Sequence, residues 1–381
     1  MLKYGMKIPL SLYIHIPWCV RKCPYCDFNS HPQRDALPEQ EYIEKLLCDL
    51  ETHRPDWRNR AIHSVFIGGG TPSLFSAAAL QRLFNRLRNY LDLAADIEIT
   101  LEANPGASEQ ERFYGFREAG INRLSLGVQS WDPEKLKCLG RIHDDEQAAK
   151  AVRMAKAAGF TNLNIDIMHG LPQQTVDDAM ADLEKTIACQ PTHISWYQLT
   201  LEPNTYFHKF PPRLPHDEIL WEIQQQGQSR LQAAGFNQYE VSAYCQDSYY
   251  SRHNLNYWQF GDYIGIGAGA HSKITREDGS VWRYWKVKNP RDYLGKDSVI
   301  DGHCSIPSEE LLLEFLMNAL RLREKIPFTL ITERTGLSRE TIDQALSNCP
   351  NKDLITRDAD HLSTTTLGYR FLNELLTDFL K

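Results

Sequence analysis

The chain has 381 residues, and its 42 lysines and arginines against 49 aspartates and glutamates give a formal net charge of −7. This acidic balance offers no electrostatic footprint for binding nucleic acid. The 42 % hydrophobic and 24 % charged content is that of an ordinary folded protein and excludes a disordered tail. No window approaches 18 uninterrupted apolar residues, and the first residues lead into a strand-like run without a signal-peptide apolar stretch. We therefore expect a soluble, cytoplasmic protein without a transmembrane segment.

Six short runs rich in β-branched and aliphatic residues recur along the chain, and stretches with helical periodicity separate them. The runs are 11–16, 64–67, 97–102, 123–128, 163–168 and 193–198, and the helical candidates are 39–51, 77–91, 108–119, 145–158 and 176–188. Alternation of strand and helix predicts a parallel sheet. An open doubly wound sheet and a barrel both satisfy this alternation.

The choice between these two folds depends on where the unusual residues fall. Cys19, the glycine turn at 68–71, Glu102, Gln129 and Asp166 all sit at or near the carboxyl ends of successive runs. In a barrel those ends converge on one mouth. Because only six units precede residue 205, the sequence predicts an α/β fold with a partial (β/α)6 barrel rather than a complete eight-unit barrel.

The pattern changes after residue 203, and three parts are predicted: a barrel core at 1–240, an aromatic and glycine-rich segment at 241–305 that closes the core, and a small, mostly helical domain at 306–381. We expect a helix at 217–234, an alternating strand at 238–244, and helices at 309–322, 328–337, 338–346 and 372–380. Residues 329–346, with a wing near 354–363, resemble a helix-turn-helix. The net charge of −7 argues against DNA binding and favours a packing or partner module.

Three of the nine cysteines, Cys19, Cys23 and Cys26, lie within eight residues as C-x3-C-x2-C, in a loop after the first predicted strand. The other six are scattered singly, which does not indicate a disulfide framework. An iron–sulfur cube normally takes four cysteines, so three cysteines leave one iron without a protein ligand. The spacing therefore indicates a metal cluster with one open coordination position.

Two other interpretations of short motifs are weaker. A zinc site normally takes four protein ligands, and the fourth could come from His15, Asp27 or His31, but the spacing is atypical of zinc. The glycines of 265–271 are similar to a dinucleotide fingerprint, but they lack the G-x-G-x-x-G spacing and do not open a βαβ unit.

The cysteine motif resembles that of the radical S-adenosylmethionine (SAM) superfamily, and the resemblance covers roughly residues 10–290. It implies a 4Fe-4S cluster whose open iron chelates the amino and carboxylate groups of SAM, and electron transfer that cleaves SAM to a 5′-deoxyadenosyl radical. Within the implied nucleotide site, the glycine turn meets the methionine amino end, Glu102 accepts hydrogen bonds from the ribose and Arg141 meets a carboxylate. The positions that the resemblance assigns to the SAM site are Tyr13, Gly69, Gly70, Thr71, Glu102, Gln129, Arg141 and Asp166.

Within that superfamily, the chain is most similar to the oxygen-independent coproporphyrinogen III dehydrogenases and the related heme chaperones. The dehydrogenases carry a further cysteine two residues after the third ligand, where this chain has Phe28. They also carry a longer segment ahead of the cluster. Both departures match the chaperone branch.

Residues 253–258 are similar to the H-N-x-x-Y-W motif of the chaperone branch, where the motif is associated with heme binding. His253 is suited to be an axial ligand, and Tyr257 and Trp258 to cover the macrocycle. Without the resemblance, the run is interpreted as an aromatic core segment. The resemblance implies a chaperone that binds heme and transfers it to acceptor hemoproteins; the rival function is a radical-SAM dehydrogenase that decarboxylates porphyrinogen propionates. The resemblance also allows a flavodoxin-like reductant, peripheral membrane contact and a homodimer that depends on the cluster.

Overall fold

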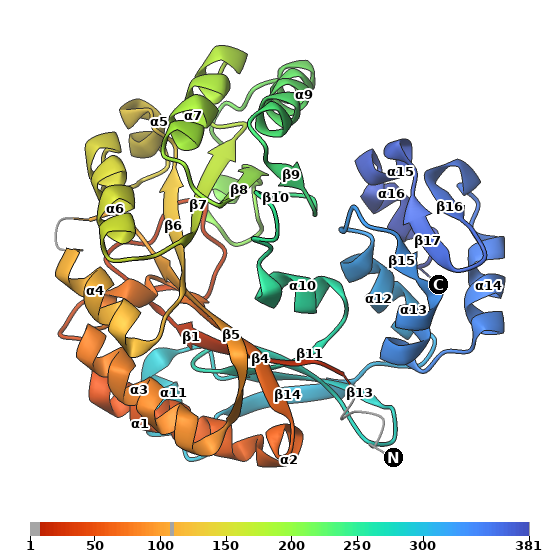
Figure 1. Cartoon of the computed structure of the whole chain (residues 1–381), viewed down its shortest axis with the longest axis horizontal. Coiled ribbons are helices and arrows are strands. Elements are labelled where there is room, and N and C mark those ends of the chain that lie inside the picture. The colour runs from red at the N-terminus through yellow and green to blue at the C-terminus, as the bar shows by residue number, and fades with distance from the viewer. Residues whose placement is uncertain (1–7, 107–109, 381) are drawn as a thin grey trace.

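The computed structural model describes residues 8–106 and 110–380, and a curved twelve-stranded sheet dominates this part of the chain (Figure 1). Seven neighbouring strands are parallel, in the order β11-β1-β4-β5-β6-β7-β8. They are β1 (Leu10–Ile16), β4 (Ala61–Gly69), β5 (Asp92–Ala103), β6 (Arg123–Gln129), β7 (Asn162–His169), β8 (His193–Gln198) and β11 (Asp262–Ile266). All six strands predicted from the sequence are present, and β11 adds a seventh beside β1.

Amphipathic helices cover the outer, convex face of this sheet (Figure 1). They are α1 (Glu39–Thr52), α3 (Ala77–Tyr90), α4 (Gln110–Ala119), α6 (Asp145–Ala157), α7 (Val176–Ala188) and α9 (Asp217–Ala233). Residues 108 and 109 of the predicted third helix lie outside the described residues. The starts of α6 and α7 are fixed by capping boxes, in which Asp144 and Thr175 accept the amide of the third helical residue. The helices bury their leucines and alanines against the strands and so form the main apolar core.

The sheet does not close into a barrel. One edge continues through the antiparallel strands β12 (His271–Thr275), β13 (Val281–Lys286) and β14 (Ile300–Ser305), and the other ends in β10 (Ala243–Cys245) and β9 (Asn237–Gln238). No pairing joins β14 to β9 among the described residues, so the predicted partial barrel is confirmed.

The single strand expected at 238–244 is wrong, because the chain reverses there. β9 pairs antiparallel with β10, with Gln238 opposite Tyr244. The reversal is stabilised by the Glu240 carboxylate, which accepts hydrogen bonds from both the amide and the hydroxyl of Ser242 at 3.0 Å. The alternating pattern that predicted one strand instead belongs to a tight turn.

The short helix α10 (Arg252–Trp258) lies on the concave face of the sheet, opposite the outer helices (Figure 1). The Glu98 carboxylate of β5 accepts the amides of Arg252 and His253, both at 3.1 Å. Nδ1 of His253 lies 2.9 Å from Oγ of Ser64, near the start of β4. Helix α10 therefore fills the barrel near the amino ends of the strands and leaves the carboxyl ends open.

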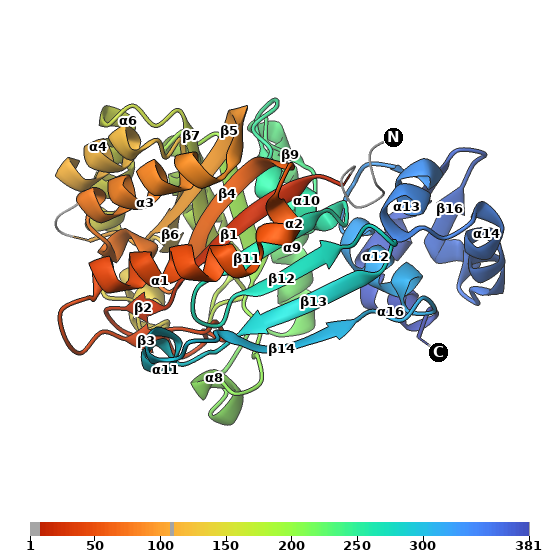
Figure 2. The same cartoon turned by 90° about the horizontal axis from the view of Figure 1, so that it is seen from below.

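The C-terminal part contains five helices and a three-stranded sheet, ordered β15-β17-β16, and it is joined to the barrel through β13 and β14 (Figure 2). Its elements are α12 (Leu311–Ala319), β15 (Ile326–Pro327), α13 (Phe328–Thr335), α14 (Arg339–Asn348), β16 (Ile355–Arg357), β17 (His361–Thr364), α15 (Thr366–Arg370) and α16 (Leu372–Thr377). The four helices expected here are present; α12, α13 and α16 are shorter than predicted, whereas α14 extends two residues further, to Asn348. The β16–β17 hairpin lies where the sequence indicated a wing. This part has an apolar core of its own around Phe315, Ile331 and Leu362.

A buried polar network joins α1 to β13 and so attaches the antiparallel edge to the barrel. The ammonium of Lys286 pairs with the Asp49 carboxylate, and neither side chain is exposed. The other oxygen of Asp49 accepts from the Tyr293 hydroxyl at 2.8 Å and from the Gly267 amide at 3.0 Å. Nε2 of His53 lies 2.8 Å from the same ammonium. Every polar group of the pair is thus satisfied inside the protein.

None of the helices in the described residues is long and apolar enough to cross a membrane.

We predict that Lys286→Met destabilises the protein by about 3–5 kcal/mol, because it leaves the Asp49 carboxylate buried without a countercharge. The free energy of unfolding from urea denaturation measures this change. The matched control is Lys288→Met at an exposed position two residues further on, which should stay within about 0.5 kcal/mol of the wild type. Equal stability of the two variants would contradict a structural role for the network.

Candidate functional site

The cysteine loop follows β1 directly and folds back along the end of β4. It contains two short paired strands, β2 (Trp18–Cys19) and β3 (His31–Pro32). The amide of Gly70 donates to the carbonyl of Ile16 at 2.8 Å, and the amide of Thr71 donates to that of Trp18 at 2.7 Å. These two bonds hold the loop against the glycine turn, so the three thiols lie at the carboxyl ends of the parallel strands.

A cavity of about 260 Å³ opens at these strand ends. The residues predicted from the sequence that line it are Cys19, Cys23, Cys26, Gly69, Gly70, Thr71, Glu102, Gln129, Arg141 and Asp166. Tyr13 is not among the lining residues, because it lies three residues before the end of β1 and therefore deeper in the barrel. Its hydroxyl contacts Nδ1 of His15 at 3.0 Å, and its ring stacks on Phe66.

The glycine turn at the end of β4 leaves no room for side chains. A Cβ on Gly70 would lie 2.5 Å from the carbonyl oxygen of Trp18, and Gly69 has a φ of +115°. The amide of Gly69 donates to the Glu102 carboxylate at 3.2 Å, and the next two amides hold the cysteine loop. Since an amino group needs acceptors, the part of this turn that suits a methionine amino end is its carbonyl oxygens.

Two buried carboxyl groups share the cavity. Burial, together with the nearby Asp166, raises the pKa of Glu102 to about 8. Burial also raises the pKa of Asp166, although its oxygens accept from Ser125 at 2.8 Å and Asn164 at 2.9 Å. Acids held in this way offer both donors and acceptors to ligand hydroxyls.

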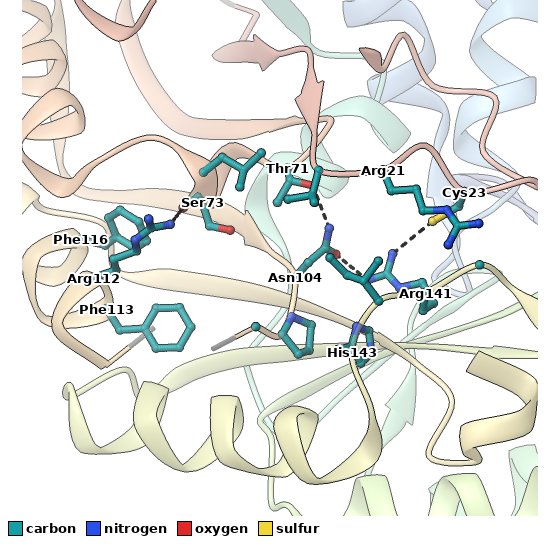
Figure 3. A pocket seen from close by; sticks show the side chains of 16 residues that line it. Arg21, Cys23, Thr71, Ser73, Asn104, Arg112, Phe113, Phe116, Arg141 and His143 are labelled. Carbon is teal, nitrogen blue, oxygen red and sulfur yellow. Dashed lines mark hydrogen bonds between the residues drawn. The ribbon is translucent and has the colours of Figure 1, made fainter. Parts of the chain in front are cut away.

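Arg141 connects the cysteines to the carboxyl ends of β5 and β6. One terminal nitrogen of its guanidinium donates to Sγ of Cys23 at 3.7 Å, and the other donates to the side-chain oxygen of Asn104 and the carbonyl of Gly127, both at 2.7 Å (Figure 3). Its Nε is buried and has no partner. An unpartnered charged donor inside a cavity is costly, so this group points to a bound acceptor.

A second cavity of about 270 Å³ adjoins the first and shares Cys23, Thr71, Asn104 and Arg141 with it. Figure 3 shows the rings of Phe113 and Phe116 on the side of this cavity away from the cysteine. The site is therefore polar next to the thiols and apolar beyond them.

Three further residues of the site were not predicted from the sequence. Asn104 donates to Oγ1 of Thr71 at 2.8 Å and so links two of the predicted positions. Ser125 holds Asp166, and the hydroxyl of Tyr197 donates to Oε1 of Gln129 at 2.7 Å. Asn104 and Tyr197 lie at or next to the carboxyl ends of β5 and β8, so the criterion that selected Glu102 could have found them.

The residues that could have completed a zinc site have other partners or point elsewhere. Nε2 of His15 lies 2.9 Å from the carbonyl oxygen of Asn29, and Nε2 of His31 lies 3.1 Å from the side-chain oxygen of the same residue. Asp27 is exposed and does not line the cysteine cavity. In the described residues, no three His, Cys, Asp or Glu side chains are grouped to hold a single metal ion.

The candidate heme residues on α10 do not line the cysteine cavity. His253 is 1 % exposed, and its two ring nitrogens lie 2.9 Å from Oγ of Ser64 and 3.0 Å from the hydroxyl of Tyr257. Burial lowers the pKa of His253 to about 3. Trp258 lies under the guanidinium of Arg321, 4.3 Å from its ring centre. A heme iron reaches the His253 ring only if α10 moves.

Comparison with protein families agrees with this geometry. Residues 13–185 match the Radical SAM superfamily, and residues 306–371 match the HemN C-terminal domain. The fold is similar to that of a solved structure of coproporphyrinogen III oxidase (HemN) from Escherichia coli, described as a radical SAM enzyme. The TM-score is 0.82, with 22 % identity over 98 % of this chain and 90 % of that one. Fold and cysteine cavity together thus define a radical SAM protein.

Full-length relatives narrow the class further. The chain is 48 % identical to "Heme chaperone HemW" of Haemophilus influenzae and to that of Escherichia coli, over 98 % of each chain in both cases. It is 35 % identical to "Radical S-adenosyl methionine domain-containing protein 1, mitochondrial" of Bos taurus over 84 % of this chain and 74 % of that one. The chain belongs to the HemW branch of the coproporphyrinogen III oxidase-like radical SAM family, a family that implies a 4Fe-4S cluster and SAM.

We predict that Glu102→Gln makes the stability of the cofactor-free protein less sensitive to a rise in pH between pH 5 and pH 8. With its pKa raised to about 8, the folded state keeps a proton that the unfolded state releases above its ordinary value of 4.5. The ionisation of Glu102 therefore opposes folding progressively as pH rises between these two values. Melting temperatures from pH 5 to pH 8 should fall less steeply for the variant than for the wild type.

The matched control for this prediction is Glu118→Gln, at an exposed position on α4. Its melting curves should run parallel to those of the wild type. Parallel curves for Glu102→Gln as well would show that this carboxyl group is ionised in the folded protein.

Proposed function

We propose that Cys19, Cys23 and Cys26 are the protein ligands of a 4Fe-4S cluster and that the adjoining cavities hold SAM. The support for this proposal comes from the residues around the three cysteines. Three thiols on one loop face a cavity that contains an unpartnered Arg141 Nε and a glycine turn in which a Cβ at Gly70 has no space. When bound, the cluster supplies one electron and an open iron position to the nucleotide.

The residues around the cluster would bind and orient the nucleotide. Carbonyl oxygens of the glycine turn would accept from its amino group, and the Arg141 guanidinium would meet its carboxylate. Glu102 and Asp166 would hold the ribose hydroxyls, with Gln129 fixed beside them by Tyr197. Phe113 and Phe116 give the second cavity an apolar wall that suits an adenine ring. Tyr13 would act indirectly, since it packs behind this site.

We propose that the protein is a heme chaperone, which binds heme and transfers it to acceptor hemoproteins in the cytoplasm. The observation that carries this proposal is the 48 % identity along 98 % of the chain to proteins named as heme chaperones, in a chain that retains the cysteine cavity. The same proposal includes three secondary interactions: with a flavodoxin-like reductant, with a second copy of the chain when the cluster is present, and with the surface of a membrane.

The HNxxYW motif would contribute to heme binding through α10. His253 fixes this helix on the barrel through Ser64, Tyr257 packs against Tyr263 of β11, and the Arg321 guanidinium stacks on Trp258. In this arrangement the motif holds α10 and Arg321 in place. Direct ligation of iron by His253 would require α10 to move away from the barrel.

The rival function is oxidative decarboxylation of coproporphyrinogen III. It would use the same cluster and SAM, but it would convert a substrate to a product instead of transferring heme. Anaerobic incubation of the reconstituted protein with coproporphyrinogen III, SAM and a reductant separates the two functions. We expect no protoporphyrinogen IX, and its formation at catalytic turnover would replace the chaperone proposal.

We predict that alanine in place of Cys19, Cys23 or Cys26 abolishes the 4Fe-4S cluster, because two thiolates cannot hold the cube that three support. Iron and sulfide are counted after anaerobic reconstitution, and absorption near 400 nm is recorded. The exposed Cys48→Ala should keep the full content. Wild-type iron and sulfide in any of the three variants would remove that cysteine from the ligand set.

We predict that His253→Ala weakens heme binding several-fold, because the change removes the hydrogen bond that joins α10 to Ser64 of β4 and leaves the Tyr257 hydroxyl without its partner within the helix. Titration of hemin, followed in the visible absorption band of heme, measures the affinity. His253→Gln is the informative partner: its amide can keep both hydrogen bonds but lacks the imidazole ligand. Recovery of binding in the glutamine variant indicates a positioning role, and loss in both variants indicates direct ligation. Unchanged binding in His253→Ala would remove this residue from the proposal.

A further inference from the structure

A wide cleft separates the open edge of the barrel from the C-terminal helices. Its volume is about 1270 Å³, against about 260 Å³ for the cysteine cavity. Residues at the end of β8 and on α9 line one side, and residues of α15 and α16 line the other; Figure 1 shows these helices facing each other. Such a volume exceeds what a typical small metabolite needs and suits a large, rigid ligand.

Exposed aromatic side chains lie on both sides of the cleft. Trp221 of α9 is 42 % exposed, and Phe371, which follows α15, is 51 % exposed. Tyr197 lines this cleft and also the cysteine cavity, so a ligand in the cleft would lie on the other side of one ring from the proposed SAM site. Large exposed rings in the walls of a cleft favour a flat aromatic ligand.

Three arginines line the cleft, each stacked on an aromatic ring. Arg323 lies 3.7 Å from the ring centre of Tyr369, Arg370 lies 4.0 Å from that of Trp221, and Arg321 stacks on Trp258. Stacking fixes the guanidinium planes and leaves their edges available to carboxylates. The cleft thus presents oriented cationic groups rather than mobile ones.

The acidic groups nearby neutralise only one of these arginines. Arg321 pairs with Glu240 at 3.2 Å. Within the described residues, no carboxylate lies at ion-pair distance from Arg323 or Arg370; Arg323 donates instead to the side-chain oxygen of Gln238. Glu202 and Glu374 also line the cleft, and Glu202 accepts from the Thr200 hydroxyl. The Arg370 guanidinium and the remaining terminal nitrogen of Arg323 are therefore left for a ligand that carries two carboxylates.

A histidine with an unpartnered nitrogen also lines the cleft. His169 ends β7, is 4 % exposed and packs against Trp196 with ring centres 4.3 Å apart. Its Nδ1 is buried without a hydrogen-bond partner, so a ligand in the cleft would meet the ring at Nε2. Burial lowers the pKa of His169 to about 4, so the ring is neutral at pH 7, which is the form that binds iron. The two nitrogens of His253, in contrast, already have partners.

We infer that this cleft is the heme site, with the propionates at Arg323 and Arg370, the macrocycle between Trp221 and Phe371, and the iron on the side of His169. This inference rests on the proposed chaperone function, because it takes heme as the cargo. It adds a site formed by two parts of the chain. A cleft open to solvent between them also suits a cargo that must be released to an acceptor.

Hemin titration of the full-length, cluster-containing protein tests the site. We expect Arg323→Gln/Arg370→Gln to lower the affinity at least tenfold, because each propionate loses a charge-assisted partner. The matched control is Arg339→Gln, since Arg339 also stacks on a ring, that of Phe328, but does not line the cleft. The control should bind hemin like the wild type.

A second measurement changes the ligand rather than the protein. Hemin dimethyl ester, whose propionates are esterified, should bind the wild type more weakly than hemin and should bind the double variant no more weakly than it binds the wild type. His169→Ala should in addition shift the absorption band of bound heme, whereas His253→Gln should leave the band unchanged.

Three outcomes overturn the inference, and they are distinguishable. If the wild type binds hemin and the double variant binds it equally well, the assignment of heme to the cleft is wrong while the chaperone proposal stands. If the ester binds the wild type as tightly as hemin does, the arginine–propionate contacts are wrong. If the wild type binds no hemin at all, the proposed function fails and the cleft site fails with it.

Discussion

The site depends on a pair of backbone hydrogen bonds. The amides of Gly70 and Thr71 hold the carbonyls of Ile16 and Trp18, and this joint fixes the cysteine loop to the end of a barrel strand. The approach is so close that any side chain on Gly70 would collide with the Trp18 carbonyl. A loop with three cysteines has many conformations on its own, and the joint selects one in which all three thiols face the same cavity.

The two ends of the barrel have different roles because one of them is filled. Helix α10 satisfies its first amides on Glu98 and its histidine on Ser64, so it closes the concave face near the amino ends of the strands. The carboxyl ends stay open, and there the buried acids and the unpartnered Arg141 nitrogen gather. A buried guanidinium nitrogen without a partner is costly, and at this end of the barrel a bound acceptor would satisfy it.

The open edge of the sheet gives the fold the wide cleft that a closed barrel would lack. Because β9 and β14 do not pair, the C-terminal helices can stand beside β8 and α9 without covering them. Tyr197 lies in the wall between the cysteine cavity and this cleft. Occupancy of one cavity can therefore affect the other through a single side chain that also holds Gln129.

The sequence by itself determined the six strand–helix units and the position of the site residues at the strand ends, because burial in a parallel sheet imposes a local pattern on each strand. It also determined the cysteine cluster, whose spacing depends on eight consecutive residues. Only the tertiary structure decided the reversal at Glu240, the depth of Tyr13, the closed environment of His253 and the placement of both Arg323 and Arg370 in the wall of the cleft. These features arise from contacts between segments that are far apart in the chain, and no local periodicity records such contacts.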